Sequence, residues 1–299
     1  MVTDRQAFLV TGGAGFVGSH VMALLLRDHP DAIAVSVDNY FTGSRDNHVD
    51  DPRAIYIHAS TVDIAKVWAN EGLPAPSVVF HMGEYSRIPQ SFDDIDITWE
   101  YNLHGTKEVV KFAHAHSAKL VYAGSSSKFG NDGQDENLNS YAWTKAKNVE
   151  YLRNFHDWYG LDYVVTYFYN VYGPSQIKTG RYATVIGIFE DQYDRGEPLT
   201  VMEPGTQTRD FTHIDDIVNG IMLAAAHGSG DGYLLGFGHE RPLLEVAEMF
   251  GVDYVLVPGR RGERERGQAD TAKARTLGWV PTIDLPDYIA DYVRTHPRG

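Results

Sequence analysis

Cysteine is absent from this sequence, and so are long apolar runs. Without cysteine the chain has no disulfide, no thiol nucleophile and no thiolate ligand for a metal. No apolar segment approaches the roughly 20 residues that cross a bilayer. The first residues also lack the basic start and long apolar region of a signal peptide, because the apolar stretch Phe8–Val10 runs directly into glycines. We therefore expect a cytoplasmic protein with no membrane partner.

Positive charge is scarce. The chain carries 26 lysine and arginine residues against 40 acidic residues, which gives a formal net charge of -14. Such a surface repels nucleic acid, and the dense charge run Arg260–Arg266 mixes both signs. An anionic small-molecule partner would therefore have to be held by a few local arginines. The histidines are scattered without the spacing of metal ligands, so we expect no metal site.

A glycine-rich turn follows the first apolar segment. The β-prone residues Gln6–Thr11 run directly into Gly12–Gly18 (GGAGFVG), and a helical pattern continues through Leu26. A strand, a glycine turn and a helix in this order are typical of a dinucleotide site. There the backbone can approach a pyrophosphate, which accepts hydrogen bonds from the N–H groups at the start of the helix. Taken alone, the glycines would also fit an ordinary tight turn.

An acidic residue ends the second predicted strand. The strand covers Ile33–Val37 and leads into Asp38, about twenty residues after the glycine turn. A carboxylate at this place accepts hydrogen bonds from the adenosine ribose hydroxyls and repels a 2′-phosphate. The sequence therefore predicts NAD, rather than NADP, as the cofactor.

Strand and helix patterns alternate along the first part of the chain. Further strands are predicted at 54–58, 77–81, 119–122, 163–168 and 233–237, and helices at 92–116 and 141–159. This alternation predicts an α/β fold with a Rossmann-type doubly wound parallel sheet. After Gly173-Pro174 the pattern changes to short helices, glycine turns and clustered arginines. We expect an NAD-binding domain over residues 1–170 and a smaller C-terminal α/β substrate-binding domain over 171–299, with some segments interleaved.

Two polar side chains stand four residues apart in the helix predicted over 141–159. Tyr141 and Lys145 lie on one face of such a helix, so the phenol and the ammonium point into the same space. A nearby cation favours the phenolate and makes tyrosine usable as a general acid or base. Tyrosine and lysine at this spacing are also common as packing and solvated charge, so the pair needs support from the rest of the chain.

Several motifs, in this order, resemble the extended short-chain dehydrogenase/reductase family, in particular its nucleotide-sugar epimerases and dehydratases. The resemblance covers nearly the whole chain. It rests on the glycine turn, Asp38-Asn39, Asp63-Ile64, NLHGT at 102–106, YAWTK at 141–145, YNVYGP at 169–174, RDFTHIDD at 209–216, and a tail with Arg260, Gly262-Glu263, Ala269-Asp270 and Leu277-Gly278-Trp279.

The resemblance implies a set of contacts to NAD. Asp38 and Asn39 would bind the ribose, Asp63 and Ile64 the adenine edge, and Asn102 would support the active site. The full set of implied cofactor residues is Gly12, Gly15, Phe16, Val17, Gly18, Asp38, Asn39, Asp63, Ile64, Met82, Gly83, Asn102, Tyr141 and Lys145.

By the same resemblance Tyr141 is the catalytic acid/base and Lys145 holds the nicotinamide ribose. The third catalytic member is the hydroxyl five residues before Gly130, which belongs to Ser125. The family's 4,6-dehydratases carry an Asp-Glu pair directly after this hydroxyl, and its xylose-forming decarboxylases carry a glutamate two residues after it. Ser126 and Ser127 occupy these positions, so elimination and decarboxylation are disfavoured. The lack of cysteine argues against relatives that epimerise C3 and C5.

Substrate contacts are also implied by the resemblance, namely Glu84, Ser86, Arg87, Ser126, Ser127, Asn170, Arg209, Arg260 and Glu263. Arg209 and Arg260 would clamp the diphosphate, since arginine suits bidentate phosphate contacts. Glu263 would bind the nucleotide ribose. The segment Gly83–Arg87 departs from the small residues usual in the family and would place charge beside the sugar.

With elimination, decarboxylation and epimerisation at C3 and C5 disfavoured, oxidation or reduction at C4 of a sugar nucleotide remains as the expected reaction. We expect an NAD-dependent nucleotide-sugar 4-epimerase, which oxidises C4 to a 4-keto intermediate and returns hydride to the other face. An NDP-sugar (hexose or heptose) 4-dehydrogenase or 4-ketoreductase is the alternative within the fold. A non-catalytic NAD-binding or scaffold protein is the alternative from another functional class, although it would need none of Ser125, Tyr141 and Lys145. UDP and GDP both stay open, and a carboxylated sugar is less expected. The helices at 92–116 and 141–159 resemble the family's four-helix dimer interface, so we expect a homodimer.

Overall fold

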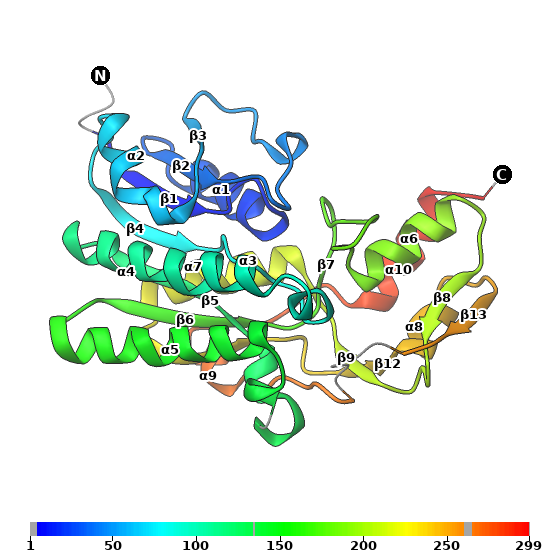
Figure 1. The fold of residues 1–299 in the computed structure, drawn as a ribbon. Helices are drawn as coiled ribbons and strands as arrows, with labels where there is room; N and C mark the ends of the chain where they lie inside the picture. The colour runs from blue at the N-terminus through cyan, green and yellow to red at the C-terminus, as the bar shows by residue number, and fades with distance from the viewer. Residues whose placement is uncertain (1–4, 134, 260–264, 299) are drawn as a thin grey trace.

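The structure, a computed structural model, describes residues 5–133, 135–259 and 265–298. A seven-stranded sheet lies at its centre, and all neighbouring strands in it are parallel (Figure 1). This confirms the predicted Rossmann-type α/β fold. In spatial order the strands are β11 (Gly230–Leu235), β6 (Tyr163–Phe168), β5 (Lys119–Ser125), β4 (Pro76–His81), β1 (Ala7–Thr11), β2 (Ile33–Asp38) and β3 (Ala54–His58).

Helices cover both faces of the sheet. Successive side chains of a strand point to opposite faces, so Phe8 and Val10 of β1 enter one core while Ala7 and Leu9 enter the other. The first core is completed by α1 (Phe16–Asp28) and α7 (Ile214–His227). The second is completed by α2 (Ile64–Asn70), α4 (Thr106–Ala115) and α5 (Ser140–Tyr159).

The direction of the chain through the sheet reverses at β1. From β1 the chain runs outward through β2 to β3, and it then returns to β4 on the other side of β1. Loops leaving the carboxyl ends of β1 and β4 therefore diverge, and ligands of such sheets bind in the crevice between them. The sheet order places the ligand site beside the glycine turn that follows β1.

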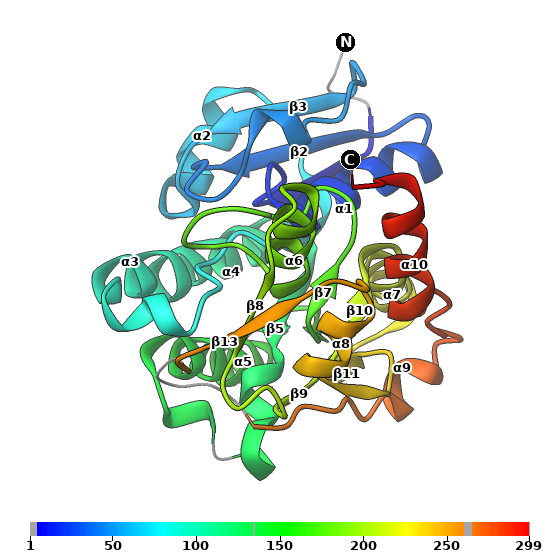
Figure 2. The ribbon, with the colours of Figure 1, turned by 90° about the vertical axis from the view of Figure 1, so that its right-hand side faces the viewer.

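A smaller domain lies beyond this edge of the sheet (Figure 2). Its own core joins Phe189, Tyr193, Phe250 and Ile289. It contains α6 (Val185–Asp194), α8 (Leu243–Glu248), α10 (Leu285–Thr295) and the pair of β8 (Leu199–Met202) with β13 (Tyr254–Val257). Short pairs join β7 (Val171–Tyr172) to β10 (Thr212–His213) and β9 (Thr208–Asp210) to β12 (Glu240–Pro242). Helix α9 covers Ala272–Arg275.

Two elements from the second half of the chain return to the large sheet. Helix α7 packs against α1, and β11 pairs with β6. Segments from the second half of the chain are therefore packed into the large domain. The strand predicted at 233–237 ends at Leu235, because the N–H groups of Phe237 and Gly238 donate to the carboxylate of Asp210 at 2.8 and 3.0 Å.

The helix predicted over 92–116 is divided into pieces. A short α3 (Ile95–Trp99) continues through a π-helical segment, Glu100–Gly105, into α4. The wider π turn leaves the carbonyl of Asn102 to accept a hydrogen bond from the Asn148 amide at 2.8 Å. Short 3₁₀ helices cover Arg45–Asn47, Thr61–Asp63, Pro89–Phe92, Ser126–Gly133 and Asp135–Asn137. Within the described ranges, no helix is both long and apolar enough to cross a membrane.

Candidate active site

A cavity of about 670 Å³ lies at the carboxyl ends of the central strands. The glycine turn, the segments that follow β4 and β5, and the first turn of α5 form one side of it. Residues of α6, β8 and β9 from the smaller domain form the other side. The cavity is therefore shared by both domains, and its volume is that of a small-molecule or cofactor site.

The glycine turn brings two backbone segments into direct contact. Gly12 has a positive φ of 70°, and a Cβ atom on it would lie 2.6 Å from Cα of Gly83. A Cβ atom on Gly18 would lie 2.1 Å from the carbonyl oxygen of Gly12. Helix α1 begins at Phe16, and its N-cap residue Gly15 makes no side-chain cap, so the first N–H groups remain for a ligand. This geometry suits a pyrophosphate at the helix N-terminus.

Asp38 lies at the end of β2, against the glycine turn. Its carboxylate accepts hydrogen bonds from the backbone N–H of Ala14 at 2.9 Å and of Tyr40 at 2.7 Å. Burial raises the pKa of Asp38 above its usual value, and these two N–H groups oppose that shift. The side chain lines the cavity, as an acceptor for ribose hydroxyls must.

The three predicted catalytic residues meet in the cavity wall. The phenol of Tyr141 donates to Oγ of Ser125 at 2.9 Å. Oγ of Ser125 is also 2.8 Å from Oγ of Ser127, and it accepts from the backbone N–H of Ser127 at 3.2 Å. Asn139 caps α5 by accepting from the N–H of Ala142 at 2.8 Å, which starts the helix just before Tyr141. The sequence spacing and the cap together place Tyr141 and Lys145 on the same cavity-facing side.

Lys145 is almost completely enclosed. Its ammonium donates to the carbonyl oxygen of Ala123 and pairs with the carboxylate of Glu84. It also lies 4.6 Å from the ring centroid of Tyr122. The cation is therefore held in place by protein groups at the cavity wall.

A buried histidine connects the glycine turn with this cluster. His81 lies between the hydroxyls of Thr11, at 2.7 Å from Nδ1, and Thr106, at 2.9 Å from Nε2. Burial lowers the pKa of His81 to about 4, so its ring is neutral at physiological pH. The Thr11 hydroxyl also accepts from the N–H of Gly83 at 3.1 Å, which helps to hold the close approach of Gly83 to Gly12.

Most of the predicted cofactor residues line the cavity, but three do not. Those that do are Gly12, Gly15, Phe16, Val17, Gly18, Asp38, Asn39, Met82, Gly83, Tyr141 and Lys145. Asp63 is exposed at the start of α2, and Ile64 turns inward to anchor that helix in the core. Asn102 is buried behind the site, where it binds the backbone of Tyr85 and the hydroxyl of Thr144. Its position suits the supporting role implied by the resemblance, rather than a cofactor contact.

The predicted substrate residues that the structure describes all line the cavity, namely Glu84, Ser86, Arg87, Ser126, Ser127, Asn170 and Arg209. The Arg87 guanidinium donates to the carbonyl oxygen of Tyr182 and so ties the segment after β4 to the smaller domain. Glu84 differs from the expected sugar contact, because its carboxylate is turned inward to polar protein groups and Lys145. Arg260 and Glu263 lie outside the described residues.

Some cavity residues carried no recognisable signal in the sequence. Phe41 and Tyr101 line the cavity with their ring centroids 5.4 Å apart, and Phe41 also packs 5.3 Å from Tyr182. Thr200 and Met202 of β8 line the part of the cavity that belongs to the smaller domain. In the sequence, such side chains cannot be told from residues of the hydrophobic core, because they line the cavity only once the two domains pack together.

The chain matches known proteins along its whole length. A family model described as the NAD dependent epimerase/dehydratase family matches residues 8–236. The chain is 29% identical over 297 residues to a putative UDP-glucose 4-epimerase of Methanocaldococcus jannaschii, across 94% of this chain and 95% of that protein. It is 28% identical over 307 residues to UDP-glucuronic acid decarboxylase 6 of Arabidopsis thaliana, across 94% of this chain and 86% of that protein.

Solved structures agree with the sequence relatives. The UDP-glucose 4-epimerase of Thermotoga maritima, solved with UDP-glucose, superimposes with a TM-score of 0.88 at 26% identity, covering 98% of this chain and 100% of that chain. The UDP-glucose 4-epimerase of Thermus thermophilus, solved with NAD, gives a TM-score of 0.85 at 26% identity and covers 97% and 99% of the two chains. In this chain the glycine turn, Asp38 and Lys145 line one cavity at the carboxyl ends of the parallel strands, where such folds bind a dinucleotide. The chain thus belongs to the NAD dependent epimerase/dehydratase family, as an NAD-dependent enzyme of the extended short-chain dehydrogenase/reductase type.

Proposed function

We propose that this enzyme is a nucleotide-sugar 4-epimerase, which oxidises C4 of the sugar to a ketone and reduces it again from the opposite face. The observation that carries the proposal is the 2.9 Å hydrogen bond between Tyr141 and Ser125 in the wall of the cavity, with Lys145 beside them. A sugar hydroxyl placed there meets a base, an orienting hydroxyl and a cation at once.

Each of these groups has a defined task. Tyr141 accepts the proton of the 4-hydroxyl as general base, and Ser125 donates a hydrogen bond to the same sugar oxygen. The N–H of Ser127 supports Ser125 from behind, at 3.2 Å from Oγ. Lys145 stabilises the phenolate by its charge. NAD, when bound, accepts the hydride from C4 and gives it back. Tyr141 then returns its proton to the sugar oxygen, so the enzyme ends the cycle unchanged.

Epimerisation needs a 4-keto sugar that can rotate in the site, so that its other face meets the cofactor, while the nucleotide stays bound. Firm contacts therefore belong on the diphosphate and the nucleoside. Arg209, Thr200 and Met202 line the cavity from the smaller domain, and an arginine there suits a diphosphate. The sugar names of the similar enzymes make a UDP-hexose the first substrate to test.

The residues beside Ser125 support epimerisation over elimination or decarboxylation. Both competing reactions call for an additional carboxylate next to the sugar. Ser126 and Ser127 offer only hydroxyls, and the hydroxyl of Ser127 is bound to Ser125 at 2.8 Å. Glu84 follows Gly83 in the cavity wall, but its carboxylate is bound by four protein donors. In this proposal the 4-keto sugar undergoes neither elimination nor decarboxylation and is reduced from its opposite face.

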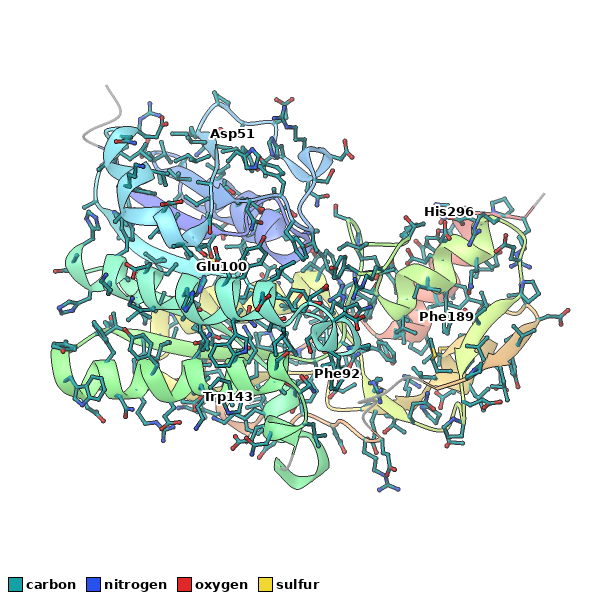
Figure 3. All side chains as sticks on the ribbon, viewed as in Figure 1. Asp51, Phe92, Glu100, Trp143, Phe189 and His296 are labelled. Atoms are coloured by element: carbon teal, nitrogen blue, oxygen red, sulfur yellow. The ribbon has the colours of Figure 1, made fainter. Side chains whose placement is uncertain are left out.

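The enzyme is proposed to act as a homodimer through α3, α4 and α5. Trp143 lies on α5, where Figure 3 labels it. Trp99 at the end of α3 stacks on Trp143 with ring centroids 5.2 Å apart, and Trp99 is 40% exposed. Ile95 on α3 is 52% exposed, so an apolar surface spans both elements. A second copy would cover such a surface.

The test is a panel of UDP- and GDP-hexoses and heptoses, followed by NMR of the sugar and by absorbance of NADH. A C4-inverted product without net NADH supports the proposal. Stoichiometric NADH with a released 4-keto product would make the enzyme a dehydrogenase instead. No conversion of any sugar, with NAD bound, would reject a 4-epimerase of these substrates.

A further inference from the structure

Glu84 is a buried carboxylate with an unusually complete set of donors. Its side chain is only 3% exposed. Oε1 accepts from the hydroxyl of Thr106 at 2.8 Å, from the amide of Asn148 at 2.8 Å and from the phenol of Tyr122 at 3.1 Å. Oε2 pairs with the ammonium of Lys145. Donors around both oxygens stabilise the ionised form of a buried carboxylate.

The donors of this network run in one direction. Since Thr106 gives its hydroxyl proton to Glu84, it can only accept from Nε2 of His81, which assigns the proton of the neutral ring to Nε2. Nδ1 of His81 then accepts from the hydroxyl of Thr11. A continuous chain of hydrogen bonds therefore leads from the glycine turn to Glu84, where it ends. Lys145 donates to the same carboxylate from the other side.

Lys145 has three N–H donors. Among the residues that the structure describes, the carbonyl of Ala123 accepts one and Glu84 accepts one, which leaves the third for the cavity side. The Lys145 side chain is 7% exposed. Among the residues that the structure describes, Glu84 supplies the carboxylate within salt-bridge distance of this ammonium. Position and effective charge of Lys145 thus both depend on Glu84.

We propose that Glu84 is a positioning residue for catalysis: it fixes the ammonium of Lys145 and offsets part of its charge, so that Tyr141 releases its proton less readily than beside an unpaired lysine. This inference rests on the proposed roles of Tyr141 and Lys145. It assigns to Glu84 the task of setting the pH range in which Tyr141 works, instead of a contact to the sugar.

Other titratable groups surround Glu84, Lys145 and Tyr141, and they add little negative charge near the phenol. The neutral His81 faces Glu84 from β4, and Tyr122 faces it from β5 with a pKa that burial raises well above 10. Arg87, from the same loop as Glu84, is the further cation that interacts with Tyr141. Removal of the Glu84 charge therefore leaves two cations near the phenol and no adjacent anion from this set. The phenolate should then form at lower pH.

The test is a pH titration of Tyr141 itself, which needs no substrate. The NAD-loaded protein is labelled with ¹³Cζ-tyrosine, and the Tyr141 resonance is assigned by its loss in Tyr141→Phe. Glu84→Gln is compared with Glu190→Gln, a matched control in the core of the smaller domain. Glu190 is 1% exposed, accepts from Gln176 and Tyr288, and pairs with Lys178 at 3.1 Å.

In Glu84→Gln the titration midpoint of Tyr141 is expected to fall by about one pH unit, because one nearby anion is lost. Glu190→Gln should leave the midpoint unchanged. A folded, NAD-bound Glu84→Gln protein with the wild-type midpoint would overturn the proposal. If that variant does not fold, Glu84→Asp moves the charge back by one methylene and should lower the midpoint by a smaller amount; an unchanged midpoint there overturns it equally. An inactive enzyme with the expected shift would reject only the proposed reaction.

Discussion

The phenol of Tyr141 lies 2.9 Å from Oγ of Ser125, although 16 positions separate the two residues in the sequence. Ser125 ends β5, and Tyr141 stands in the first turn of α5. Between them, Ser126–Gly133 and Asp135–Asn137 form 3₁₀ helices, and Asn139 caps α5 just before Tyr141. The position of the pair is thus set by the end of a strand and the start of a helix.

Removal of the Tyr141 hydroxyl should abolish turnover without loss of the cofactor. General acid–base catalysis contributes about 10²–10⁴-fold to rate, so Tyr141→Phe is expected to lower kcat by at least that range. NAD binding, measured by calorimetry, should change little because the glycine turn and Asp38 are untouched. Activity close to wild type in this variant would refute the assigned acid/base.

The contact of Gly12 with Gly83 predicts a large effect of a single methyl group. Gly12→Ala would place a Cβ atom 2.6 Å from Gly83 Cα, at a positive φ of 70°. Gly72→Ala is the matched control, since Gly72 has a φ of 61° and no atom within 4 Å of the added Cβ. Both pay about 1 kcal/mol for the left-handed backbone. Gly12→Ala should lose roughly 2 kcal/mol more in free energy of unfolding by urea, together with NAD binding. Equal losses in the two variants would argue against the close approach.

Stability should fall in mildly acidic solution because of His81. Its pKa is lowered to about 4 in the folded protein, while an unfolded histidine takes up its proton near pH 6.5. Between these values the unfolded state binds the extra proton, so stability decreases as the pH falls from 6.5 towards 4. The full contribution is roughly 3 kcal/mol, of which about 2 kcal/mol is lost by pH 5.0. Urea unfolding at pH 7.5 and 5.0 measures this loss, and His81→Gln should show a smaller difference between the two pH values. If the stability difference between the two pH values were as large in His81→Gln as in the wild type, groups other than His81 would cause the loss of stability.

Replacement of the exposed Trp99 by an acidic residue should dissociate the proposed dimer into monomers. Trp99→Asp puts a charge on the apolar surface of α3 and α5, and sedimentation velocity is expected to show monomers that still bind NAD. Val280→Asp is the control, because Val280 is 55% exposed and lies far along the chain from this surface. It should remain dimeric. A wild-type monomer at micromolar concentration would rule out the proposed homodimer.

The residues whose place could be predicted from the sequence are those that depend on short-range patterns. The glycine turn, Asp38, Tyr141 and Lys145 are of this kind, and each of them lines the cavity. Their roles stay predictions. Asp63 was expected there too, but the direction of a side chain after β3 depends on how α2 packs, which the local pattern does not contain.

Glu84 shows the same limit from another side. Its sequence position, directly after Gly83, correctly indicated a place at the edge of the cavity. Its partners come from β5, α4 and α5, between 22 and 64 positions away. Only the packed fold brings these donors to one carboxylate. The sequence therefore predicted a sugar contact for Glu84, whereas the structure shows an ion pair with Lys145.

The fate of the hydrogen at C4 tests the central claim most directly. The sugar nucleotide that the enzyme converts is prepared with deuterium at C4 and incubated in ordinary water with excess unlabelled NAD and NADH. If C4 is oxidised and reduced within one binding event, NMR and mass spectrometry should find the deuterium still at C4 of the inverted product. Loss of deuterium to water, or its transfer to the free NADH pool, would contradict an epimerase that keeps its cofactor and its 4-keto sugar bound throughout the cycle.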